Sequence, residues 1–349
     1  MTTKTEPGAD LSTVDDPHRP SVLSRVVAAN TFWIALVLVG LFIMFSVLSP
    51  DAFATKFNIQ QLFMQTAVLL VVSTGMTFVI ITSGIDLSVG SVLIFSGMVS
   101  AKTMNSMSPN DSALNAGWGV IIVGLLAALA SGAVWGLING LLVAKAKIPA
   151  LIVTLGSLGA ALGFADLIND GSDIRSIPDK LNHTLGRGTS FGDIPNVVIV
   201  AAVITLIGAW LLHTTKFGRY TFAVGSNAEA ARRAGIKVTS HLVRVYLLSG
   251  VLAGAAGFMS LAYFHTTAIS AHTSDNLSAI AAVVLGGTSL FGGIGTMLGT
   301  VIGVFIPAVL KNGFNIIGVQ DYWQLIAVSA VLVAAVWFDQ QRRRARNQL

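Results

Sequence analysis

The chain of 349 residues contains no cysteine and few charged residues, and both shortages exclude functions. Without cysteine there is no disulfide, no thiol nucleophile and no cysteine-ligated metal. Only 11% of the residues are charged, against roughly 25% in soluble domains, while 54% are hydrophobic. The mean hydropathy is +0.76. A soluble fold of this composition would expose large apolar patches, so we expect lipid to surround most of the chain.

Several catalytic motifs are also missing. There is no Walker A sequence G-x-x-x-x-G-K-[ST], so we expect the chain not to hydrolyse ATP by that route. There is no H-E-x-x-H sequence, and the six histidines are scattered, which predicts neither a zinc site nor a catalytic triad. The apolar runs hold no chain of acids and bases such as proton-coupled carriers often have. The sequence therefore predicts a protein that is not an enzyme, binds no cofactor or metal, and takes energy from elsewhere.

The net charge of +5 does not indicate a nucleic-acid partner. The basic residues are dispersed among the ends of apolar runs, as in membrane proteins whose cytoplasmic loops retain Lys and Arg. We expect the lipid bilayer, and not nucleic acid, to be the partner that this charge pattern serves.

Long apolar runs, continuous and not alternating, favour a helical bundle over a β-barrel. We predict an all-α polytopic membrane protein with about ten transmembrane helices, some of them broken by glycine. The predicted spans cover residues 31–48, 62–82, 92–101, 120–143, 149–168, 197–212, 242–264, 279–290, 295–310 and 322–337.

Three regions are predicted from composition: a disordered cytoplasmic tail at 1–26, a transmembrane permease domain at 27–338 and a basic cytoplasmic tail at 339–349. Even numbers of spans separate the basic clusters, which places both termini in the cytoplasm. Five of the six tryptophans lie near span ends, as amphipathic rings do at a membrane interface. Trp135 lies inside a span and is expected to face protein.

A basic cytoplasmic loop at residues 214–241 is the longest polar interruption in the second half of the chain. Ser226 and Glu229 have capping-box spacing, which predicts a short helix between Ser226 and Gly235 with an alanine-rich side. Such a helix suits docking to another protein, whereas the plainer reading is a solvated connector. Six basic residues lie in or beside the loop: Lys216, Arg219, Arg232, Arg233, Lys237 and Arg244.

Two glycine-containing breaks, G-I-D-L-S-V-G at 84–90 and G-T-S-L-F-G-G at 287–293, interrupt apolar sequence without a long polar loop. Paired breaks of this kind indicate a transport path, because non-helical backbone inside a membrane must be buried in protein or line a cavity. The alternative is two tight turns with close helix packing. The candidate path residues are Gly84, Asp86, Ser88, Gly90, Asn139, Thr154, Gly287, Thr288, Ser289 and Gly293.

Three polar residues of this set have competing roles. Asp86 would be functional if it lay at membrane depth, but it could instead cap a helix that starts at Leu87, and the neighbouring turn residues favour the cap. Asn139 and Thr154 could face a lumen or bond a neighbouring helix.

Four segments, in this order, resemble the permease subunit of ATP-binding-cassette (ABC) importers of the ribose, xylose, arabinose and galactose class. They are T-S-G-I-D-L-S-V-G-S at 82–91, K-I-P-A-L-I-V-T-L-G at 147–156, the stretch 218–236, and 279–293 with its continuation N-G-F-N-I-I-G at 312–318. The resemblance implies a homodimer of this chain, a separate cytoplasmic ABC ATPase, and an extracytoplasmic sugar-binding protein that delivers the substrate.

The basic loop also resembles the importer coupling motif E-A-A-x-x-x-G, at Glu229 to Gly235. In this interpretation the loop helix enters a groove of the ATPase, where Arg232 and Arg233 can pair with acids. Residues 245–248 depart from the I-x-L-P of the broader motif. The candidate coupling residues are Ser226, Asn227, Glu229, Ala230, Ala231, Arg232, Arg233 and Gly235.

The sequence thus predicts a permease subunit of an ABC importer that translocates a pentose, hexose or polyol across the cell membrane. Alternatives are an ion-coupled secondary carrier, a structural or receptor subunit, and an ABC permease for branched amino acids or nucleosides. In importers of this class the binding protein, which is another chain, largely selects the cargo.

Overall fold

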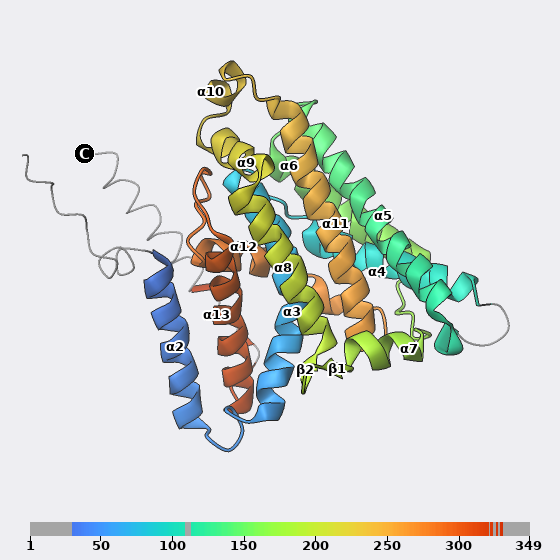
Figure 1. Ribbon diagram of the computed structural model, residues 1–349. Coiled ribbons are helices and arrows are strands. Elements are labelled where there is room, and N and C mark those ends of the chain that lie inside the picture. Colours follow the sequence, from blue (N-terminus) through green and yellow to red (C-terminus); the bar gives the residue numbers. More distant parts are fainter. Residues whose placement is uncertain (1–29, 109–112, 321, 324–325, 327–328, 331–349) are drawn as a thin grey trace, which may run out of the picture.

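The computed structural model describes residues 30–108 and 113–320, together with 322, 323, 326, 329 and 330. The predicted tails at 1–26 and 339–349, and most of the predicted last span at 322–337, lie outside the described residues. Within the described part the chain is a bundle of helices with one small hairpin (Figure 1).

Most of the helices are joined by short connections, whereas residues 169–195 form a long connection that contains several short elements. The described elements are α2 Asn30–Leu48, α3 Lys56–Ile81, α4 Val89–Ser106, η1 Ala113–Asn115, α5 Trp118–Ala144, α6 Ala150–Ile168, α7 Asp179–Leu181, η2 Asn182–Gly186, β1 Thr189–Ser190, β2 Ile194–Pro195, α8 Asn196–Thr214, α9 Lys216–Ser226, α10 Ala228–Arg233, α11 Val238–Phe264, η3 Ser270–His272, α12 Asp275–Leu285 and α13 Met297–Ile316.

Six of the described helices are long and apolar enough to cross a membrane: α3, α5, α6, α8, α11 and α13. Helix α2 contributes a shorter apolar segment, and α12 is only 11 residues long. The prediction of an all-helical polytopic membrane protein is therefore confirmed. The count of about ten spans stays a prediction.

Helices α3 and α11 form the centre of the bundle. In their most apolar stretches 83% of α3 and 72% of α11 are buried, against 28% of α6 and α8 and 33% of α5. The outer helices expose large apolar side chains such as Leu126, Leu155 and Leu206, which suit contact with lipid. The prediction for Trp135 is confirmed, because it is 9% exposed and its ring lies 6.0 Å from that of Phe95.

Small residues bring α5 and α11 into backbone contact. Gly132, Gly136 and Gly140 recur every four residues on α5. The first two face Gly250 of α11, and Gly140 faces the backbone of Val243 in the same helix. A methyl group on Gly132 would collide with the carbonyl oxygen of Gly250. Without a hydrophobic driving force between helices in lipid, such close packing is what holds two spans together.

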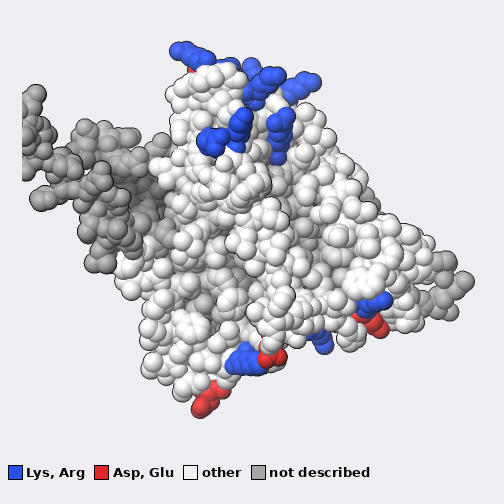
Figure 2. Space-filling view, in the orientation of Figure 1, with Lys and Arg blue, Asp and Glu red and all other residues white. Residues whose placement is uncertain are grey.

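The two ends of the bundle differ in charge (Figure 2). Lys and Arg gather at the end that carries α9 and α10, whereas the opposite end carries both signs. At that opposite end Lys56, at the start of α3, pairs with Asp193 beside the hairpin at 2.5 Å, and Gln60 donates to the Asp193 carbonyl at 2.8 Å. The hairpin is thereby fastened to α3.

Replacing Gly132 by leucine should separate α5 from α11 and destabilise the protein by about 1–3 kcal/mol, the usual cost of overpacking. The measurement is the thermal unfolding midpoint of the purified chain in detergent. Gly119→Leu is the control in the same helix, because a Cβ at Gly119 meets nothing within 4 Å. Equal midpoints for the two variants would contradict the packing described.

Candidate functional site

The basic loop folds into two short helices, α9 and α10, that project from one end of the bundle (Figure 1). The predicted capping box is wrong, because α9 continues through Ser226 and leaves that residue at its end. Asn227 is the N-cap of α10 instead, and its side-chain oxygen accepts from the Ala230 N–H at 2.9 Å. Asparagine and serine cap helices about equally well, so sequence alone did not separate them.

Helix α10 turns one face inward and leaves the others exposed. Ala231 is buried against Val224 of α9 and Val238 of α11, while Ala228, Ala230 and Ala234 are exposed. The predicted end of the helix is confirmed at Gly235, whose φ of +85° is a conformation that favours glycine.

The charged side chains of α10 pair within the helix. Glu229 accepts from Arg232 at 2.8 Å and lies 3.4 Å from Arg233. Surface pairs of this kind stabilise a helix little, so both arginines can exchange Glu229 for an acid on a partner.

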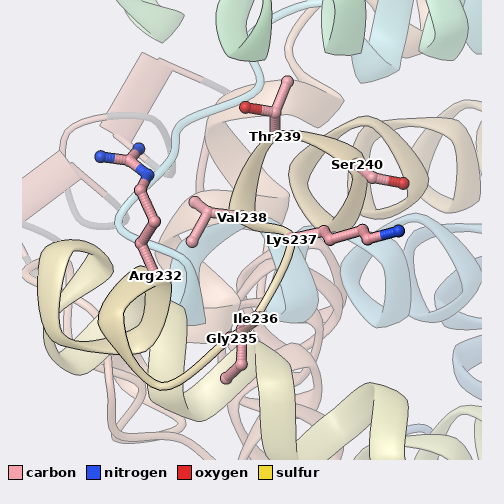
Figure 3. A pocket seen from close by; sticks show the side chains of 7 residues that line it. All are labelled: Arg232, Gly235, Ile236, Lys237, Val238, Thr239 and Ser240. Atoms are coloured by element: carbon pink, nitrogen blue, oxygen red, sulfur yellow. The ribbon is translucent and has the colours of Figure 1, made fainter.

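A shallow hollow of about 520 Å³ lies where α10 ends and α11 begins. Figure 3 shows Arg232 and Lys237 extending on different sides of this connection. The hollow gives the exposed end of α10 a basic rim beside small side chains, which together could receive an acidic protein surface. Its lining residues are Arg232, Gly235, Ile236, Lys237, Val238, Thr239 and Ser240.

Helix α9 touches the second glycine-containing break and the residues that lead into the first one. A Cβ on Gly225 would collide with the Ile81 carbonyl oxygen and lie 2.8 Å from the Gly293 nitrogen. Ser83 Oγ donates to the Gly225 carbonyl at 3.2 Å and to the Phe291 carbonyl at 2.8 Å. The Gly293 N–H donates to the Ile81 carbonyl at 2.9 Å. The end of α9 and the two breaks therefore form one junction, which sequence spacing did not reveal.

The first break buries its polar groups by pairing them. Asp86 is 2% exposed, and its Oδ1 accepts from the Ser88 N–H at 3.0 Å and from Ser88 Oγ at 2.6 Å. Its Oδ2 accepts from Ser249 Oγ of α11 at 3.1 Å. The predicted cap of a helix starting at Leu87 is wrong in position: α4 starts at Val89 with Ser88 at its N-cap.

Asn139 and Thr154 join the same network from α5 and α6. Asn139 donates to Ser88 Oγ at 2.8 Å and accepts from Ser157 Oγ at 2.5 Å. Thr154 Oγ1 donates to the Ile85 carbonyl at 3.2 Å. Of the two roles considered for these residues, bonding between neighbouring segments is the one observed. Ser157, like Ser249, was missed, because a lone serine in an apolar span carries no pattern that names its partner.

The glycines of the first break sit where other groups come close. A Cβ on Gly84 would lie 2.7 Å from Tyr246 Oη, and one on Gly90 would lie 2.7 Å from the His272 carbonyl oxygen.

The second break is a tight loop between α12 and α13. The Ser289 N–H donates to the Ile294 carbonyl at 3.0 Å, and Gly287 and Gly293 have positive φ. Thr288 and Ser289 are buried, and Thr288 Oγ1 has no hydrogen-bond partner among the described residues. Among those residues there is also no group of three or more His, Asp or Glu that could hold a metal ion.

The sequence matches a protein family over residues 58–336, well over half of the chain. The family is described as "Branched-chain amino acid transport system / permease component". This chain belongs to that permease family. The permease is therefore a transport subunit and a multi-pass protein of the cell membrane, in agreement with its six apolar helices in the described part.

Curated relatives of the permease include sugar transporters. It is 38% identical over 301 residues to the ribose import permease protein RbsC of Escherichia coli K12, which covers 85% of this chain and 90% of the relative. It is 39% identical over 310 residues to RbsC of Bacillus subtilis 168, covering 87% and 91%. It is 37% identical over 311 residues to the D-allose transport system permease protein AlsC of E. coli K12, covering 89% and 90%.

These relatives confirm the family resemblance inferred from the four sequence segments. No solved structure matches the permease.

Replacing Asp86 by alanine should leave the buried Ser88 N–H and Ser249 hydroxyl without their acceptor. Each unsatisfied buried group costs about 1–3 kcal/mol, so the unfolding midpoint in detergent should fall clearly. Asp86→Asn keeps an oxygen for Ser88, and Ser249 can accept from the amide, so its midpoint should fall much less. Equal effects of the two substitutions would show that the network does not depend on this acceptor.

Proposed function

We propose that this permease is the membrane-spanning subunit of an ABC importer that carries a monosaccharide, a pentose, hexose or polyol, into the cell. The names of its ribose and allose relatives support the sugar assignment. The observation that carries the mechanism is the junction at Gly225, where the end of α9 contacts the residues just before the first break and Gly293 of the second break.

The energy source in this proposal is a separate cytoplasmic ABC ATPase. Closure of the ATPase dimer on ATP moves α10, and α9 passes that movement to the two breaks. Backbone contact at Gly225 supports this transmission, because two backbones in contact leave no soft side chain between them to absorb the motion. The breaks then shift between arrangements open to one side of the membrane or the other.

The residues of the coupling surface are those of the exposed helix and its ends. Ser226 closes α9, Asn227 caps α10, and Gly235 ends it. Ala230 and Glu229 lie on the exposed side with Arg232 and Arg233, and Ala231 anchors the helix. The polar and glycine residues of the two breaks hold in place the backbone that shapes the path. Their hydrogen bonds support this positioning role.

The proposed arrangement places the α9–α10 end in the cytoplasm, which its basic surface supports (Figure 2). It comprises a permease domain at 27–338 with about ten spans and cytoplasmic tails at 1–26 and 339–349. A second copy of the chain completes the path, and an extracytoplasmic binding protein delivers the sugar.

A branched-chain amino acid is the second candidate cargo, because the family description names that class. It shares the proposed architecture and partners, and differs only in what the path and the binding protein accept.

Substituting alanine for Gly225 should uncouple transport from ATP hydrolysis. The added Cβ would push α9 away from Ile81, and sugar uptake should fall by about 5- to 150-fold, the usual range of a coupling free energy. The assay is uptake into proteoliposomes holding the complete transporter, with ATP hydrolysis measured in parallel. Gly119→Ala makes the same change where no atom lies within 4 Å of the new Cβ. Full uptake by the Gly225 variant would remove the proposed transmission route.

Cells that lack this permease should lose uptake of one labelled sugar from a panel of pentoses, hexoses and polyols, with leucine and uridine included. Uptake of that sugar by the parent strain should persist when a protonophore is present, because ATP supplies the energy. Loss that a protonophore reproduces would indicate an ion-coupled carrier. Loss of leucine or uridine uptake alone would retain the architecture and overturn the sugar assignment.

A further inference from the structure

The chain turns back into the bundle after α11. Helix α11 ends at Phe264, and His265 follows with a left-handed φ of +58°. Seven residues later His272 lies alongside α11, with its Nε2 2.7 Å from Ser260 Oγ. The start of α12 therefore lies beside the last turns of α11.

Three polar side chains form a line at this turn. His272 Nδ1 lies 2.7 Å from Asp275 Oδ2, and His272 Nε2 contacts Ser260. The order is that of a Ser-His-Asp triad, which the scattered histidines of the sequence did not suggest. Ser260 is only 4% exposed, so it cannot attack a substrate as a triad serine must. The histidine instead orients the carboxylate of Asp275.

The first turns of α4 and α12 are neighbours at this place. A Cβ on Gly90, the second residue of α4, would lie 2.7 Å from the His272 carbonyl oxygen and 3.4 Å from the Asn276 nitrogen. The two helices therefore begin next to one another, with Asn276 buried between them and Ser274 exposed. Interrupted helices that meet in this way are where transporters of other folds place their substrates.

At the start of α12, side-chain oxygens of two residues lack a hydrogen-bond partner among the described residues. Asp275 Oδ2 faces His272, while no described residue donates to Asp275 Oδ1. Asn276 is only 6% exposed, and its Oδ1 has no hydrogen-bond partner among the described residues. Ser274 is exposed, and its hydroxyl does not cap α12.

Buried polar atoms without partners are rare and call for an explanation. We propose that Ser274, Asp275 and Asn276 form a binding site for the hydroxyl groups of a sugar, with His272 and Ser260 as positioning residues. The proposal rests on the function proposed above. A carboxylate oxygen can accept two hydroxyl donors, and an amide and a hydroxyl can each both donate and accept, which matches a polyhydroxylated ligand.

The charge of the site favours a neutral ligand over an anionic one. Asp275 occupies the first turn of α12, where the helix dipole would otherwise attract an anion. An anionic ligand would bring a second negative charge close to that of Asp275. A sugar brings hydroxyl groups that donate to Asp275 without adding charge.

Asp275→Asn tests the site. The experiment measures initial uptake rates in cells that carry the complete transporter, using the sugar that the wild type imports and its monodeoxy analogues. Uptake of the parent sugar should fall about tenfold or more, since hydrogen bonds to charged groups are among the strong ones. The analogue that lacks the hydroxyl bound by Asp275 should lose little further. A merely structural role would lower uptake of every analogue by the same factor and would overturn the proposal.

Two further variants and a control complete the experiment. Asp51→Asn makes the same chemical change in the exposed loop between α2 and α3 and should transport normally. His272→Gln should reduce uptake less than Asp275→Asn, because an amide can still bond the carboxylate. If Asp275→Asn does not reach the membrane, uptake by Ser274→Ala tests the proposal instead, because that substitution removes only an exposed hydroxyl. Unchanged uptake of the parent sugar by Ser274→Ala would overturn the proposed binding site.

The wild type separates this inference from the function on which it rests. A wild type that imports leucine and no sugar would overturn the proposed function. Sugar import by the wild type, together with unchanged import by Asp275→Asn, would overturn only the binding site.

Discussion

The structure depends on one constraint: inside a lipid bilayer every backbone polar group must find a partner within the protein. Helices meet this demand by themselves, and the interruption between α3 and α4 does not. There Asp86 accepts from the Ser88 N–H and from Ser249 of α11. Asn139 of α5 donates to the Ser88 hydroxyl, and Thr154 of α6 donates to the Ile85 carbonyl. The second interruption satisfies itself more locally, as a tight loop. Specific contacts therefore hold each interruption in place, and moving one of them alone would break those contacts.

Much of the fold follows from composition and run length. The helical class, the positions of the described spans, the inward orientation of Trp135 and a short loop helix ending at Gly235 all depend on local sequence or on the contrast between lipid and protein. The parts that were missed depend on contacts between distant segments. Nothing in the local pattern indicates that Gly225 meets Ile81, or that Ser260 faces His272. Cap positions were also wrong, because serine, asparagine and aspartate are near-equivalent caps and tertiary packing decides which one is used.

Small residues perform two different tasks in this permease. Along α5 and α11 they allow two long helices to pack at backbone distance, which stabilises the bundle. At the end of α9 a single glycine lets this helix touch the backbone of α3 and of the second break. The first task stabilises the bundle, and the second transmits movement in the function proposed above, although the local sequence signal, a glycine among apolar residues, is the same.

The attachment of α3 at both of its ends has a mechanical consequence. At one end Lys56 and Gln60 hold Asp193 beside the hairpin, and at the other end the Ile81 carbonyl holds the Gly293 N–H. A helix that is held at both ends and buried along most of its length moves as a rigid body. A push or a tilt at one end is therefore passed to the other end, and the helix resists sliding along its axis. Displacement of the second break on one side of the membrane would thus be registered at the hairpin on the other, roughly 39 Å away along a helix of 26 residues at about 1.5 Å per residue.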